Sequence, residues 1–228
     1  MSATGETVPA APVPGWRWAR AFRQRFYDVV ASVYLYNEHT GWQGLERLLE
    51  AVKRKLPGET DFHAVIAKHA ADERKHYFLF RKHFQTEGRM PLQVDATFGY
   101  VDQFIRLIFR QPLDRLDQEA ILADDRQFFR MCRLIMMTEF RGMKQVASLL
   151  ENRMIRRNPS LLRIYRVIEE DEPSHCLPYQ RWLEAKGSHL PGFQERITDL
   201  WIHWSLLLIK IPLLFLNWRT PRLAEFPQ

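Results

Sequence analysis

One pattern of chemically active residues occurs twice in the sequence. Each copy has a lone glutamate that is followed, 35 residues later in the first copy and 33 in the second, by a Glu-x-x-His motif. Residues three apart in a helix lie on the same face, so each motif can hold a metal ion while the lone glutamate approaches from a paired helix. Four carboxylates and two imidazoles can bind two metal ions inside a helical bundle. The predicted ligands are Glu38, Glu73, His76, Glu139, Glu172 and His175.

The type and number of these ligands also indicate which metal they hold. Carboxylate and imidazole ligands suit iron or manganese better than they suit zinc, which closed structural sites hold with thiolates. Four glutamate charges balance two divalent cations, and this balance matters because a net charge is costly to bury. We therefore expect two iron ions, with manganese or a mixed iron and manganese pair as alternatives.

Two aspartates precede the ligand glutamates and are predicted to support the histidines. A buried metal-bound histidine needs an acceptor for its other ring N–H. We expect each aspartate to serve the histidine of the opposite helix, Asp72 for His175 and Asp171 for His76. Substitution of either aspartate by alanine should then weaken metal binding.

Small and aromatic residues lie one turn from the lone glutamates. Gly41 and Gly142 follow them by three residues, and a glycine inside a helix costs roughly 1 kcal/mol relative to alanine. This cost indicates a need for space, either to admit dioxygen or substrate or to let two helices pack closely. Tyr34 precedes Glu38 by one turn, and is either a redox or hydrogen-bonding group or a core residue.

The second motif contains a proline that could disturb it. Pro173 removes one helical hydrogen bond and is expected to kink or bulge the helix. Glu169 lies one turn before Glu172 and is either an extra ligand or a solvated charge. The other histidines are expected to be solvated or satisfied polar groups: His39, His63, His69, His83 and His189.

Apolar residues at steps of three and four predict helices throughout, and no strand pattern competes. Thr60 and Asn158 are expected to cap helix N-termini, Gly88 to cap a C-terminus, and Pro159 to open a helix. The expected helices are 16–55, 60–88, 100–109, 117–157, 159–187 and 193–217. The fold class is thus all-α: a four-helix bundle with one long crossover and an extra apolar C-terminal helix. We expect a disordered leader over 1–15, the bundle over 16–187, and the apolar helix and tail over 188–228.

With these six ligands and this connectivity, the chain resembles the ferritin-like di-iron carboxylate superfamily over 16–187. The resemblance implies a bundle that activates dioxygen or peroxide at two irons. Rubrerythrins of this superfamily have a further glutamate where this chain has Gly142, together with a Cys-x-x-Cys domain that is absent here. Ferritins lack the second histidine ligand, whereas this chain has both. The set therefore looks more like the oxygenase and oxidase branches.

The charge and the C-terminal segment suggest an anionic partner. The net charge is +6 and the isoelectric point about 9.5. No nucleic-acid motif is present, and the two cysteines suggest no disulfide framework. Residues 200–218 have the length of a membrane span but contain Lys210, which is costly inside a bilayer. The segment could lie at the membrane interface, cover the bundle as a fifth helix, or span the bilayer. We expect a cytoplasmic protein with peripheral contact at the inner face of a membrane through 196–222.

The expected function is a dioxygen-dependent di-iron enzyme that hydroxylates an apolar, membrane-derived substrate. Desaturation and other oxidations are the next expectations. Such an enzyme needs an external electron donor, and a homodimer is compatible with the sequence. The alternative is a ferritin-like protein that handles iron or binds metal without an organic substrate.

Overall fold

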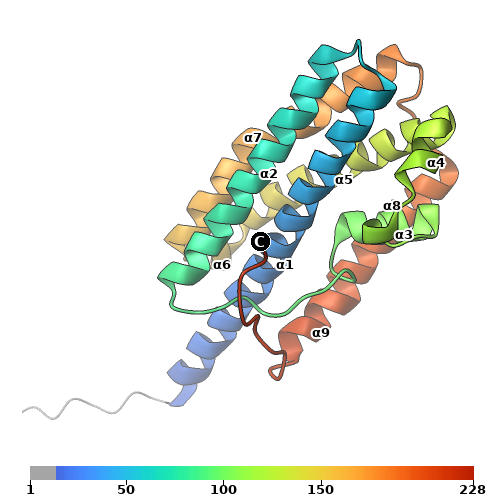
Figure 1. Ribbon diagram of the computed structural model, residues 1–228. Helices are drawn as coiled ribbons and strands as arrows, with labels where there is room; N and C mark the ends of the chain where they lie inside the picture. Colours follow the sequence, from blue (N-terminus) through green and yellow to red (C-terminus); the bar gives the residue numbers. More distant parts are fainter. Residues whose placement is uncertain (1–13) are drawn as a thin grey trace, which may run out of the picture.

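The computed structural model describes residues 14–228, and every regular element in that range is helical (Figure 1). The all-α prediction is therefore confirmed. Most of the predicted leader lies outside the described residues, although Pro14 and Gly15 already belong to the first helix. The four long helices are α1 (Pro14–Lys55), α2 (Thr60–Thr86), α5 (Asp125–Glu151) and α7 (Pro159–Ala185).

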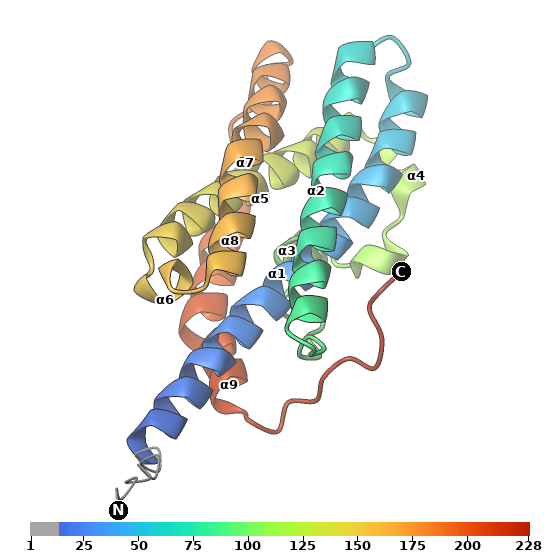
Figure 2. The same cartoon turned by 90° about the vertical axis from the view of Figure 1, so that its left-hand side faces the viewer.

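The long helices pack in a definite order. Helix α1 lies along α2, α5 lies along α7, and α2 contacts α7, whereas α1 and α5 make few backbone contacts (Figures 1 and 2). The segment that connects α2 to α5 packs against both α1 and α5. It contains α3 (Tyr100–Phe109) and α4 (Gln118–Ala123).

Polar side chains at helix ends explain most boundaries, including one that the sequence interpretation missed. The helix predicted over 117–157 is wrong as a single unit, because it breaks into α4, α5 and α6 (Arg153–Arg156). At each break a side chain caps the following helix: Asp124 accepts from the backbone of Arg126 and Asn152 from that of Met154. Such side chains compete with the helix for backbone donors and favour a new N-terminus.

The other ends agree more closely with the sequence pattern. The Asn158 side chain caps α7 through the backbone N–H of Leu161. Gly88 follows α2 with a φ of +63°, a left-handed conformation that favours glycine. Thr60 is the first helical residue of α2 and not its cap, which is Glu59. Helix α7 continues through Pro173 without the predicted bulge.

The C-terminal segment packs outside the four long helices. Helix α8 (Phe193–Ser205), a π-helical turn (Leu206–Lys210) and α9 (Ile211–Leu216) follow one another without a break. Helix α8 packs on α3, and α9 packs on α1. By length and composition, Phe193–Leu216 is apolar enough to cross a membrane, a test that core helices of soluble proteins also pass.

Two buried apolar clusters lie on either side of a polar layer. One cluster contains Phe62, Phe128 and Tyr179, and the other contains Leu35 and Tyr165. On α1, α2 and α7, the residues of the two clusters fall before and after the predicted metal ligands in the chain. The polar layer therefore lies between two groups of packed hydrophobic side chains, which bury most of it.

Candidate metal centre

All four long helices contribute carboxylates or imidazoles to the polar layer. Its ligating atoms form two groups, each with all atoms within 4.8 Å of one another. The first group contains Glu38 of α1 with Glu73 and His76 of α2. The second group adds residues from α5 and α7 and consists of His69, Glu73, Glu139 and His175. Glu73 belongs to both groups, so the structure joins two potential cation sites through one carboxylate.

The separations within the groups are short enough for a shared ligand. In the first group, Nδ1 of His76 lies 3.2 Å from Oε2 of Glu38 and 3.9 Å from Oε1 of Glu73. In the second, Nδ1 of His175 lies 3.6 Å from the same Glu73 oxygen and 3.9 Å from Oε2 of Glu139. A cation placed among these atoms would need only small movements of the side chains.

His69 is a member that the sequence interpretation missed. We expected a satisfied polar group, yet the imidazole is fully buried and its Nε2 lies 3.5 Å from Glu139 and 3.6 Å from Glu73. Its ring stacks on His175 with 4.2 Å between centroids. His69 precedes Glu73 by four residues and His76 by seven, and this spacing on one helical face was the available signal.

The predicted cross-helix contacts from aspartate to histidine are present. Nε2 of His76 lies 2.9 Å from Asp171, and Nε2 of His175 lies 3.3 Å from Asp72. Lys75 contacts both aspartates, at 2.6 Å and 3.0 Å. Despite partial burial, hydrogen bonds from lysines and the histidines hold the pKa of both aspartates below its usual value.

These contacts determine which ring nitrogen faces the centre. An ionised carboxylate only accepts hydrogen bonds, so each histidine must carry its proton on Nε2, toward the aspartate. The Nδ1 lone pair then faces the glutamates, which is the state a metal requires. Consistent with this, Nδ1 of His175 has no hydrogen-bond partner within residues 14–228.

The two glycines make room for carboxylates from the neighbouring helices. A Cβ atom on Gly41 would lie 2.8 Å from Oε2 of Glu73, and one on Gly142 would lie 3.4 Å from Oε1 of Glu172. The space expected from the sequence therefore exists, and glutamate side chains occupy it.

Three further residues that the sequence pattern singled out, Glu172, Tyr34 and Glu169, have different surroundings. Glu172 is buried beside the centre, but its oxygens belong to neither group, and its Oε2 has no hydrogen-bond partner within the described chain. Tyr34 packs edge-on against Tyr165, and its buried hydroxyl also lacks a partner among the described residues. Of the two alternatives for Glu169, the structure supports the solvated charge and not the extra ligand, because Glu169 is exposed on α7 and belongs to neither group.

Other histidines make contacts away from the centre, as expected. His39 hydrogen bonds to the carbonyl of Gln228, His63 to that of Leu56, and His83 to the hydroxyl of Ser160. His189 also lies outside both groups.

Burial makes the metal-free centre electrostatically unfavourable. Burial, together with neighbouring glutamates, raises the pKa of Glu38 and of Glu73 to about 8. Burial and the same neighbours raise the pKa of Glu172 well above its usual value. Burial would lower the pKa of His69, but Glu139 and Glu73 raise it to about 9. Without metal, Glu38, Glu73, Glu172 and His69 therefore favour their protonated forms, and bound cations would oppose the rise in the glutamate pKa values by favouring the charged carboxylates.

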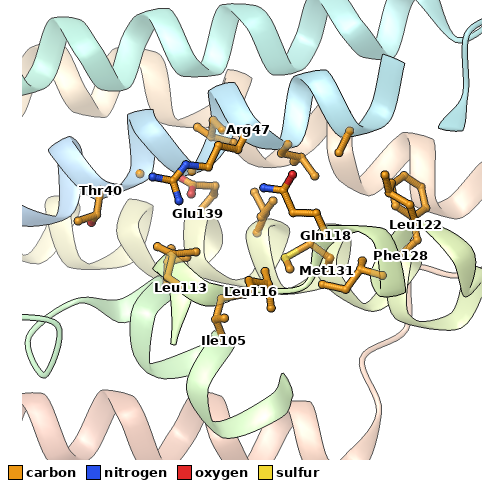
Figure 3. Close-up of a pocket in the computed structure, with 18 residues that line it drawn as sticks. Thr40, Arg47, Ile105, Leu113, Leu116, Gln118, Leu122, Phe128, Met131 and Glu139 are labelled. Atoms are coloured by element: carbon orange, nitrogen blue, oxygen red, sulfur yellow. The ribbon is translucent and has the colours of Figure 1, made fainter. Parts of the chain in front are cut away.

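An apolar pocket approaches the centre between α1, α3, α4 and α5. Its volume is about 90 Å³, and Glu139 is among its lining residues (Figure 3). Figure 3 shows Thr40 and Glu139 toward one end and Leu122 and Phe128 toward the other. Most of the remaining lining is aliphatic or methionine, including Leu45, Leu48, Ile105, Met131 and Ile135.

Fold and site together define an all-helical protein whose buried histidine and glutamate cluster could hold metal. Comparison of the chain with protein-family models, curated proteins and solved structures finds no match.

Proposed function

We propose that the polar layer binds two metal ions, in the first place iron, and that the chain is a non-haem di-iron oxidoreductase. The observation that carries the proposal is the pair of adjacent ligand groups that share Glu73. His69 adds a third imidazole to the two that the sequence motif supplies. Two bound irons would supply the redox chemistry for activating dioxygen, with electrons from an external donor.

The fit of the residues to two cations rests on charge and on unpaired atoms. Within residues 14–228, Nε2 of His69, Nδ1 of His175 and Oε2 of Glu172 are buried without hydrogen-bond partners. Buried polar atoms are rarely left unpaired, so these atoms are suited to metal coordination. Glu38, Glu73, Glu139 and Glu172 together would balance two divalent charges.

The connectivity supports a ferritin-like bundle. Helices α1 and α2 form one antiparallel pair, α5 and α7 form the other, and the long segment between α2 and α5 crosses from one pair to the other. One long crossover, together with inward glutamates and histidines, is what a ferritin-like carboxylate protein would be expected to have, and it supports this part of the proposal.

The pocket supports an apolar substrate for this enzyme. An aliphatic lining would hold an apolar group beside Glu139 and keep water from the same space. Hydroxylation of a carbon atom held there is the proposed reaction, and desaturation is the alternative oxidation.

The deciding experiment is anaerobic reconstitution with ferrous iron, followed by metal analysis and an ultraviolet-visible spectrum before and after oxygen. We expect about two irons per chain and a new absorption band after oxygen. His175→Ala should lose iron, and His39→Ala should retain it, because His39 lies outside both groups. Less than one iron per chain would refute the metal centre.

A second measurement separates an enzyme from an iron store. With excess iron and oxygen, an enzyme keeps a fixed iron content, whereas a ferritin-like store accumulates iron and assembles into a cage visible by size-exclusion chromatography. Growth of such a mineral core would overturn the enzymatic proposal while leaving the metal site intact.

A further inference from the structure

In the C-terminal helical segment, large apolar side chains face solvent, which is the reverse of a helix that covers the core of a soluble protein. Three of its charged side chains, Glu195, Asp199 and Lys210, are bonded to other elements of the chain, whereas Arg196 is exposed. Glu195 contacts Arg130 and Arg133 of α5 at 3.2 Å and 2.8 Å. Further along the segment, Nζ of Lys210 donates to the carbonyl of Thr97, at 2.7 Å.

The opposite face of the segment is apolar and exposed. Trp201 is 63% exposed and Leu208 is 65% exposed. We call this face the outer surface; its large exposed residues are Phe193, Ile197, Leu200, Trp201, Trp204, Leu207, Leu208, Ile209, Leu213, Leu216 and Trp218. Contiguous apolar surface of this extent is uncommon on soluble monomers and marks an interaction site.

The N-terminal part of α1 extends the same surface. The ring of Phe22 packs edge-on against Phe215 of α9, with centroids 4.7 Å apart. Trp18 is 75% exposed and lines a shallow pocket together with Phe22 and Trp218. Two segments from opposite ends of the chain thus form one apolar surface, with α9 beside α1 (Figure 2).

We infer that the outer surface docks on an anionic lipid bilayer, with the helical segment lying in the plane of the interface. Trp201 and Trp204 lie on α8 and Trp218 follows α9, and tryptophan favours the interface between hydrocarbon and headgroups. Exposed arginines accompany the tryptophans at the α1 and α9 end, namely Arg17, Arg20 and Arg219. Arginines in such a position attract anionic headgroups.

The contacts of the inner face argue against a span. Crossing the bilayer would separate Glu195 and Lys210 from their partners on the bundle and place them in hydrocarbon. Docking in the interface keeps these contacts and covers only the face that is already apolar.

Charge also favours lipid over a second copy of the chain. The acids of α8, Glu195 and Asp199, are bonded to arginines of α5. The same surface of a second copy would therefore offer few carboxylates for Arg17, Arg20 and Arg219. Anionic headgroups would supply the missing negative charge.

The test is sedimentation of the full chain with vesicles of phosphatidylcholine alone and of phosphatidylcholine mixed with phosphatidylglycerol. We expect binding to the mixed vesicles that weakens as salt is raised. The double variant Leu208→Glu with Leu213→Glu should lower the partition coefficient roughly tenfold or more. Leu177→Glu is the matched control, since Leu177 is a partly exposed leucine on α7, and it should bind as the wild type does.

A charge variant and a measurement of mass complete the design. Arg17→Gln with Arg20→Gln should reduce binding to the mixed vesicles and leave any binding to neutral vesicles unchanged. Circular dichroism should show that all variants stay helical. Equal vesicle binding by the double leucine variant and its control would overturn the inference. The inference would also be overturned if light scattering showed that the wild type is a dimer, the wild type did not bind vesicles, and the double leucine variant were monomeric.

Discussion

Replacing Glu38 by glutamine should stabilise the metal-free protein and weaken the metal-loaded one. Burial, with a contribution from Glu139, raises the pKa of Glu38 from 4.5 to about 8. A raised carboxyl pKa means that the folded state holds a proton that the unfolded chain has released. The associated stability is therefore complete below about pH 4.5 and is lost as the pH rises to 8. Glutamine keeps the shape of the protonated acid and has no proton to lose.

The size of the effect follows from the width of this pH window. Each pKa unit corresponds to about 1.4 kcal/mol, so the full shift amounts to roughly 5 kcal/mol. Between pH 6.5 and pH 8 the wild type should lose about 2 kcal/mol through Glu38 alone. Glu73 titrates over the same range and adds to the loss. The lowered pKa of His175, about 3, acts in the opposite direction only below about pH 6.5.

Urea unfolding followed by circular dichroism, with chelator present, measures this prediction directly. At pH 8 metal-free Glu38→Gln should be more stable than the wild type by several kcal/mol. With ferrous iron under anaerobic conditions the order should reverse, because metal stabilises the state that binds it. Glu46→Gln, on the exposed side of α1, is the control and should keep the wild-type dependence on pH. A metal-free wild type whose stability stays level or rises from pH 6.5 to 8 would refute the reasoning.

Three other substitutions, the first with a matched glycine control, test separate parts of the structure. Gly41→Ala should lower the iron content without destabilising the fold, because its Cβ would displace the Glu73 carboxylate. Gly44 has open space around it, so the control Gly44→Ala should raise the free energy of unfolding by up to about 1 kcal/mol and keep its iron. Asp171→Asn should weaken iron affinity by about tenfold or more in an equilibrium titration, since it alters the partner of a histidine ligand. Glu195→Gln should cost about 2 kcal/mol at pH 7 in urea unfolding. Arginines lower the pKa of Glu195 from 4.5 despite its burial, so its stabilisation is present above about pH 4.5 and is lost as the pH falls through the lower folded value. The difference from the wild type should therefore shrink in acid, and a constant difference would count against this assignment.

The repeated motif was sufficient to predict much of the site. Helical periodicity alone places Glu73 and His76 on one face, and the chemistry of a ligated histidine calls for an acceptor behind it. Both aspartates lie at the predicted histidines of the opposite helix for this reason. The cap at Asn158 also depends only on local sequence.

Other features depend on contacts that a linear pattern does not contain. His69 has the same helical spacing as the ligands, but only its burial between Glu73 and Glu139 separates it from a solvated histidine. The breaks at Asp124 and Asn152 arise from two side chains that compete locally with a long apolar periodicity. The inward direction of Lys210 requires an acceptor on a distant segment, the carbonyl of Thr97.

The residues that would form a metal centre destabilise the protein when no metal is bound. Glycines inside α1 and α5 reduce helix stability, and both leave room for glutamate carboxylates. Those carboxylates are buried between two apolar clusters, where the charged form is disfavoured unless a cation is present. Selection for stability alone would replace such a layer with apolar side chains, since packed hydrophobic residues are commonly at least as stable as buried charges. Glycines opposite glutamates, histidines that contact aspartates and unpaired ligand atoms would all have one physical explanation under the proposed function: a cation whose binding would offset their cost.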